Sequence, residues 1–106
     1  MVSPGIILIL CTAPEEEAES IARTIIGERL AACVSISPVR SVFRWEGKVE
    51  CDEEHLMICK TTAEKSGDLI RRIEEIHSYD VPEVIALHVH DGNTSYLDWV
   101  RFEVAG

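Results

Sequence analysis

The sequence predicts an α+β fold of the split β-α-β, or ferredoxin-like, type, closed by a C-terminal helix. Four short apolar or alternating runs are typical of strands, and two longer runs carry apolar residues at helical spacing. Their order along the chain is β-α-β-β-α-β. At 106 residues the chain has room for one core, so residues 1–106 are expected to form a single domain.

The first strand and the first helix are predicted near the N-terminus. Residues 6–11 form a continuous apolar run, which is typical of a strand buried on both faces. Thr12 and Glu15 have the spacing of a capping box, and this predicts the beginning of a helix. The apolar stripe of that helix consists of Ala18, Ile21, Ala22, Ile25 and Ile26.

The middle of the chain is expected to form a hairpin. Residues 33–37 alternate between apolar and polar, and Pro38 then interrupts the strand, which places it at a sheet edge or a bulge. A second extended piece covers residues 39–45, whereas the acidic residues 50–54 are interpreted as a solvated loop. Residues 55–61 are the next strand, antiparallel to its predecessor.

The second half repeats the helix and strand signals. Thr61 and Glu64 again have capping-box spacing, so a second helix is expected to follow and to end at His77. Its apolar stripe consists of Leu69, Ile70, Ile73 and Ile76. The fourth strand is predicted over residues 83–89, and residues 95–104 form a short closing helix.

The second strand predicts an oligomer. In this topology it lies at a sheet edge, and here it is long and carries Phe43 and Trp45. An exposed apolar edge invites pairing with another chain. Identical subunits arranged in a closed ring would cover it.

Composition excludes several partners. Ten Lys and Arg residues against nineteen acidic residues give a net charge of −9, so the basic face required by nucleic acid is missing. No run approaches the roughly 20 apolar residues of a membrane span, and residues 6–10 are too short for a signal peptide. We therefore expect a cytoplasmic protein without a nucleic-acid or membrane partner. Its four cysteines contain no C-x-x-C pair and are expected to be free thiols.

Two dense patches indicate a site for a small ligand or a metal ion. Residues 77–83 place an imidazole, a phenol and two carboxylates between a helix and a strand, and residues 43–48 combine aromatic and charged side chains. No nucleophile-and-base order and no glycine-rich phosphate loop is recognisable. The sequence thus predicts a binding protein, not an enzyme, and no organic cofactor.

Six motifs stand in order along nearly the whole chain, and together they resemble the CutA divalent-cation tolerance family. They are Leu10-Cys11-Thr12-Ala13-Pro14, Leu30-Ala31-Ala32-Cys33-Val34, Trp45-Glu46-Gly47-Lys48, Lys60-Thr61-Thr62, His77-x-Tyr79-x-Val81-Pro82-Glu83 and Gly92-x-x-x-Tyr96-Leu97-x-Trp99. The resemblance implies a ferredoxin-like fold and a homotrimer whose subunits are held together by extended strands. It also implies a role in tolerance to copper and other heavy metals. Ser78, Asp80 and His88 depart from the residues usual in that family, which are Pro, Glu and Pro.

The resemblance implies Cys11 and His77 as copper ligands. Cys11 lies beside a helix N-terminus, where the helix dipole favours a thiolate. It is equally typical of a buried small apolar residue, and His77 of a cation at a helix C-terminus. Glu83 is a third candidate, as an oxygen ligand or as a carboxylate that holds the His77 tautomer. Copper or another divalent cation suits this ligand set.

Trp45, Glu46, Lys60 and Tyr79 are expected to line a cleft between subunits. For Trp45, plain interface packing is the simpler interpretation. Lys60 interrupts an apolar strand and is expected to pair with a carboxylate, either Glu46 or Glu83.

Two further sets are interpreted as structural, because spacing by two is what any half-buried strand produces. They are His55, Met57 and Cys59 on one strand, and His88 and His90 on another.

Three functions stay open at this point. The first is a metal-binding homotrimer for divalent-cation tolerance. The second is a PII-like signalling trimer that holds a small anionic metabolite, suggested by Arg44, Lys48 and Lys60 and by analogy of fold. The third is a structural trimer that anchors a partner.

Overall fold

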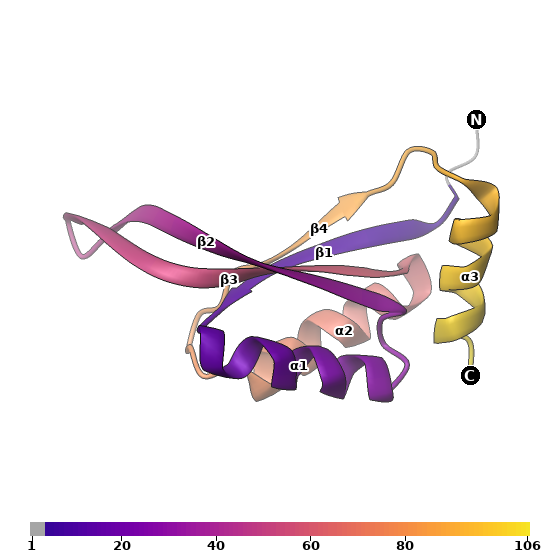
Figure 1. Cartoon of the computed structure of the whole chain (residues 1–106), viewed down its shortest axis with the longest axis horizontal. Coiled ribbons are helices and arrows are strands. Elements are labelled where there is room, and N and C mark those ends of the chain that lie inside the picture. The colour runs from indigo at the N-terminus through magenta and orange to yellow at the C-terminus, as the bar shows by residue number, and fades with distance from the viewer. Residues whose placement is uncertain (1–3) are drawn as a thin grey trace.

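Four antiparallel strands form one sheet, in the order β2-β3-β1-β4, in the computed structural model, which describes residues 4–106. The elements follow each other as β1 (Ile6–Ala13), α1 (Glu15–Gly27), β2 (Cys33–Trp45), β3 (Lys48–Thr62), α2 (Ala63–Ile76), β4 (Val84–His88) and α3 (Thr94–Val104). Helices α1 and α2 lie side by side on one face of the sheet, and α3 stands across one end (Figure 1). The predicted split β-α-β fold with a C-terminal helix is confirmed.

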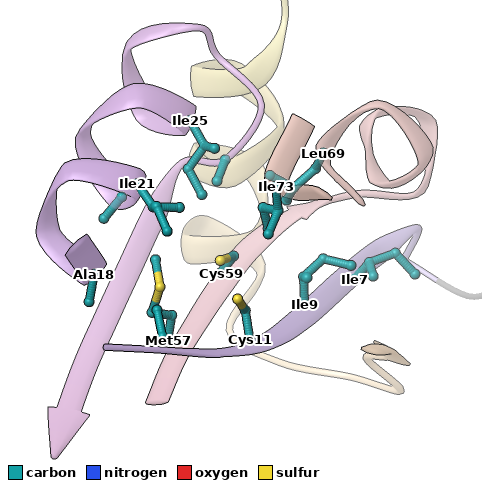
Figure 2. Packing of buried hydrophobic residues seen from close by; sticks show 13 residues of the cluster. Ile7, Ile9, Cys11, Ala18, Ile21, Ile25, Met57, Cys59, Leu69 and Ile73 are labelled. Atoms are coloured by element: carbon teal, nitrogen blue, oxygen red, sulfur yellow. The ribbon is translucent and has the colours of Figure 1, made fainter. Parts of the chain in front are cut away.

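The core fills the space between the sheet and helices α1 and α2. Ile9, Ile25, Leu69 and Ile73 are completely buried there, and Figure 2 shows the helix side chains pointing down onto those of the strands. Burying each such side chain contributes about 1.5–3 kcal/mol relative to leaving it in water. Both predicted apolar helix stripes supply this layer, with the exception of Ile26, which is 38% exposed.

The β2–β3 hairpin is longer and more regular than predicted. Its register is unbroken from Cys33 opposite Lys60 to Trp45 opposite Lys48, and Pro38 is accommodated because β2 is an edge strand. The acidic residues 50–54 belong to β3, so the prediction of a solvated loop is wrong. Carboxylates fit here because this part of the hairpin extends past the helices as an arm (Figure 1).

The tip of the arm is a two-residue turn. Glu46 and Gly47 both have positive φ, at 50° and 77°. This combination is the signature of the type I′ turn, whose twist matches that of the flanking strands. Glycine meets the requirement without steric cost, whereas Glu46 adopts a conformation that side chains disfavour.

Neither predicted capping box forms. Thr12 is the seventh residue of β1, and α1 begins after Pro14 without a side-chain cap. Thr61 also remains in a strand and donates its hydroxyl hydrogen bond to the Leu30 carbonyl at 2.7 Å. In both places the strand continues past the predicted start of the helix. The threonine therefore stays in the strand and does not cap the helix. Among the described helices, only α3 has a side-chain cap: the Asn93 side chain accepts a hydrogen bond from the Tyr96 N–H.

The other face of the sheet is largely uncovered. Helix α3 packs only against its end, where Ile6, Leu97 and Val100 are buried. Directly opposite residues of the β1–β4 ladder, such as Leu8 and Leu87, share this face. Leu87 remains 47% exposed and the neighbouring Ile85 50%. We call this surface the open face.

Candidate functional site

His77 is fixed at the end of α2 by two hydrogen bonds of its ring. Nε2 lies 2.8 Å from the Thr12 carbonyl oxygen, and Nδ1 accepts the Tyr79 backbone N–H at 3.0 Å. Because Nδ1 is an acceptor, the ring is neutral and carries its proton on Nε2, which donates to Thr12. The side chain is fully buried. In this state both ring nitrogens are occupied by bonds within the protein.

Cys11 points into the core from the strand that carries Thr12. It is completely buried, and Figure 2 shows its sulfur directed toward that of Cys59 beneath the helices. Burial, and then the charges of Glu83, Glu17 and Glu54, raises the pKa of the Cys11 thiol from 9.0 to about 12. The expectation that the helix dipole would favour a thiolate is therefore wrong, since desolvation dominates.

Carboxylates surround this end of the sheet. Glu17 accepts the Ser78 N–H at 3.1 Å, and its oxygen lies 3.7 Å from His77 Nδ1. Glu54 is buried and accepts a long hydrogen bond of 3.4 Å from the Tyr79 hydroxyl. Glu83 is exposed and immediately precedes Val84, the residue that pairs with Cys11. A negative potential thus gathers beside a thiol and an imidazole.

The roles of Cys11, His77 and Glu83 as metal ligands stay a prediction. The three residues lie at the same end of the sheet, as the topology suggested. Among residues 4–106, however, no group of three His, Cys, Asp or Glu side chains is arranged to hold a metal ion. Glu17 and Glu54 are not among the site residues predicted from the sequence. Their only signal in the sequence is an acidic helix start and the acidic run 50–54.

Three of the predicted cleft residues are spread along the hairpin, and Tyr79 lies in the loop after α2. Trp45, which is 58% exposed, and Glu46 lie at the tip of the arm. Lys60 is twelve residues beyond the turn on β3, which corresponds to roughly 40 Å of extended strand. Tyr79 lies between them, with its ring against His77 at 4.7 Å between centroids. Trp45 and Lys60 are therefore far apart within one subunit, and a cleft that they share between subunits stays a prediction.

Lys60 has different partners from those expected. Its Nζ donates to Ser35 Oγ at 2.5 Å and lies 3.7 Å from Cys33 Sγ. Neither Glu46 nor Glu83 is its partner, so the predicted ion pair is wrong. Cys33 faces Lys60 directly across the β2–β3 ladder, and this places a hydroxyl and a thiol within reach of the ammonium group.

Comparison with known proteins agrees with this architecture. A family model described as CutA1 divalent ion tolerance protein matches residues 7–103. The divalent-cation tolerance protein CutA of Thermus thermophilus is 46% identical over 96 residues, which are 89% of this chain and 93% of that protein. The solved structure of the periplasmic divalent cation tolerance protein CutA from Archaeoglobus fulgidus superposes with a TM-score of 0.92 at 40% identity. That match covers 94% of this chain and 99% of the other.

The fold and its arm define a small α+β protein of the ferredoxin-like class. Within that class the chain belongs to the CutA divalent-cation tolerance family, because the family model and the relatives cover most of its length. This is not a known enzyme family. The family resemblance predicted from the sequence motifs is confirmed.

The predicted cytoplasmic location is wrong. The Archaeoglobus structure is described as periplasmic. The rice relative, Protein CutA 1, is chloroplastic; it is 46% identical over 97 residues, which are 90% of this chain but 55% of the rice protein. Relatives with this fold thus occur in different compartments. Neither free thiols nor the absence of a recognisable signal determines the cellular location. Within residues 4–106, none of the helices has the length and hydropathy needed to span a membrane.

Proposed function

We propose that this chain functions in divalent-cation tolerance as a homotrimer that binds copper or a similar soft cation. Residues 1–106 act as one binding domain, with no catalytic step and no organic cofactor. The observation that supports the proposal is that Cys11 precedes Thr12, whose carbonyl His77 bonds, and that the charges of Glu17, Glu54 and Glu83 act on the Cys11 thiol at this end of β1.

The ligand chemistry suits copper better than magnesium or calcium. A thiolate and an imidazole are soft and intermediate ligands, and a carboxylate of Glu83 would complete the set. The cation would replace the thiol proton of Cys11, so binding releases a proton and weakens as the pH falls. The carboxylates that add to the effect of burial on the Cys11 thiol pKa also favour a cation that displaces the proton.

Binding would require a local rearrangement. His77 Nδ1 is the nitrogen on the side of Glu17, and it becomes a ligand only when the Tyr79 N–H releases it. Residues 78–83 connect α2 to β4 without regular structure, so this segment can move without disturbing the sheet. Glu83 is at its end and would move with it.

The open face and the arm support the homotrimer. Leu87 and Ile85 leave an apolar surface that a monomer would expose to water, and β2 offers an unpaired edge of 13 residues. A closed ring of three subunits would cover both. Trp45, Glu46, Lys60 and Tyr79 would then line a cleft between subunits, since Trp45 is too far from Lys60 within one chain.

A copper titration with two matched cysteine variants tests the site. Cu(I) is titrated anaerobically against a chromophoric competitor, in a background where Cys33 and Cys51 are changed to serine. We expect Cys11→Ala to weaken binding by more than about tenfold. Cys59→Ala is the control, because Cys59 is equally buried and its thiol also has a pKa of about 12. An affinity of Cys11→Ala equal to that of the background protein would reject the site.

One observation favours the anion-binding alternative. The ammonium of Lys60 bonds a hydroxyl and approaches a thiol, and among the described residues it has no carboxylate partner. A thermal-shift screen separates the two functions: stabilisation by small carboxylates or phosphates, without any by Cu(I) or Zn(II), would favour a PII-like signalling trimer. No response to either class would favour a structural or anchoring role.

A further inference from the structure

The loop from β4 to α3, residues 89–93, has no regular structure and contains the only Asp-Gly sequence of the chain, Asp91-Gly92. It leaves the sheet at the end where α3 stands (Figure 1), beyond the last residue pair of β4, His88 opposite Ile7. Asp91 and Gly92 are both exposed. They belong neither to β2 nor to the strands of the open face, the two surfaces through which the proposed homotrimer would be held together.

The Asp91 side chain folds back onto the following peptide group. The Gly92 backbone N–H donates a hydrogen bond to Asp91 Oδ1 at 2.8 Å. This bond keeps the Gly92 nitrogen beside the side-chain carboxyl carbon of Asp91, and these are the two atoms that would join to close a five-membered ring. In the part of the chain that the structure describes, no backbone carbonyl accepts the Gly92 N–H. No helix or strand bond therefore has to break before the ring closes.

Glycine after the aspartate is the second requirement. Without a Cβ, Gly92 leaves its nitrogen unhindered and lets the peptide group rotate. The other aspartates of the chain do not have this combination. Asp80 is followed by the β-branched Val81, which crowds the nitrogen. The remaining three lie in a strand or a helix, where regular backbone bonds fix the peptide groups: Asp52, Asp68 and Asp98.

We propose that Asp91 is a modification site, at which aspartate rearranges to isoaspartate through a cyclic succinimide with the Gly92 nitrogen as the nucleophile. This inference is independent of the proposed cation site. The loop follows the end of β4 that pairs with Ile7, near the start of β1, whereas Cys11 and Thr12 lie near the other end of that strand.

The reaction is balanced with water as its only co-reactant. The Gly92 nitrogen bonds to the carboxyl carbon of the protonated Asp91 side chain, and the carboxyl hydroxyl leaves as water with the proton of the nitrogen. Water then adds to the main-chain carbonyl carbon of the ring and breaks its bond to nitrogen. The main chain now runs through the former side-chain carboxyl group, and the former main-chain carbonyl becomes a free carboxylate, which returns the proton to solvent. No electrons are transferred, and the composition of the chain is unchanged.

The rearrangement would alter the beginning of α3. The next residue, Asn93, caps this helix by accepting the Tyr96 N–H at 3.2 Å. An additional methylene in the main chain and a displaced carboxylate would shift this cap relative to β4. Because α3 buries Leu97 and Val100 over the end of the sheet, the modified chain should unfold at a lower temperature. Enzymes that methylate isoaspartyl carboxylates are the class of partner that the product fits.

The rearrangement is tested by ageing the full chain in dilute buffer with a chelator. Peptide mass spectrometry with electron-transfer fragmentation separates isoaspartate from aspartate at each position. We expect isoaspartate to form at Asp91 at least about tenfold faster than at Asp80 or Asp98. A synthetic peptide of residues 87–96 gives the rate without the fold, and the folded chain should react at a similar rate. Isoaspartate in the peptide but none at Asp91 of the folded chain would overturn the proposal.

Two substitutions test the roles of the reacting groups. Gly92→Ala should slow the rearrangement by about tenfold. A Cβ at this position would meet the Leu97 side chain at 3.5 Å, an ordinary contact, so this variant is expected to fold. Gly67→Ala in α2 is the matched control, with a nearest contact of 3.6 Å to Arg71, and should leave the rate unchanged.

Asp91→Asn should form the same ring faster, because ammonia leaves more readily than water from an uncatalysed ring closure. The isoaspartate that follows is measured in the same way. A rate at Asp91 no higher than at Asp80 would contradict the proposal, as would an unchanged rate in Gly92→Ala.

Discussion

The His77 imidazole joins the end of α2 to the end of β1 through a 2.8 Å hydrogen bond to the Thr12 carbonyl. The same ring accepts the Tyr79 N–H, so one side chain orders a strand end, a helix end and the following loop. This structural role exists without any metal. Loss of His77 therefore affects stability as well as any cation binding, and the two effects have to be measured separately.

His77→Ala should destabilise the protein by about 2–4 kcal/mol, because it leaves the Thr12 carbonyl and the Tyr79 N–H without their partner. Urea unfolding in the presence of a chelator measures this without a contribution from bound metal. His90→Ala is the control, since His90 is exposed, and should change stability by less than about 0.5 kcal/mol. Equal midpoints for the two variants would show that the ring bonds contribute nothing.

Ile73→Ala should cost about 2–5 kcal/mol, because this completely buried side chain of α2 leaves a cavity between helix and sheet. Ile26→Ala in α1 makes the same chemical change at a position that is 38% exposed, and its cost should be much smaller. Thermal unfolding at one fixed protein concentration compares them. A similar loss in both variants would contradict the position of the core.

Leu87→Glu should break up the proposed trimer, because it places a charge in the apolar open face. Val81→Glu introduces the same charge in the exposed loop before β4 and should leave assembly unchanged. Light scattering measures the mass, which we expect to be three times the 11.9 kDa of one chain for the unmodified protein and for Val81→Glu. A folded single chain in the unmodified protein would contradict the trimer.

Glu28 should contribute a pH-dependent part of the stability. Its carboxylate accepts two hydrogen bonds of 2.9 Å from Arg72, which joins α1 to α2, and this guanidinium lowers the pKa of Glu28 below 4.5. A lowered carboxyl pKa stabilises the fold above the unfolded value, and this contribution disappears as the pH falls through the folded value. The difference in urea midpoint between unmodified protein and Glu28→Gln should therefore shrink between pH 6 and the acid range. Glu16→Gln, in the exposed first turn of α1, is the control and should show no such convergence. A difference in urea midpoint that does not change with pH would mean that the Glu28–Arg72 pair does not cause the pH dependence.

The predictions that the structure contradicts have one physical origin. Local sequence patterns favour one structure where a neighbouring strand of the sheet stabilises another. Thr12 and Thr61 had the spacing of helix caps, yet both pair in the β1–β3 ladder. The acidic residues 50–54 have the composition of a loop, but each of them lies opposite a residue of β2 in the β2–β3 ladder.

The candidate site was predicted in part. Its position followed from topology, since the end of β1 and the end of α2 must meet in a split β-α-β fold. The partners of each side chain did not follow. Glu17 and Glu54 approach His77 and Tyr79 from segments that are distant in sequence, and Ser35 rather than a carboxylate receives the Lys60 ammonium.

The order of strands and helices, the edge position of β2 and the family follow from the amino-acid sequence, because apolar periodicity and ordered motifs are properties of the chain alone. The enclosed, protonated state of the Cys11 thiol and the position of Cys33 beside an ammonium group emerge from the folded structure. Burial and the distances between charges arise when remote segments pack together, and these two quantities set the chemistry of a side chain.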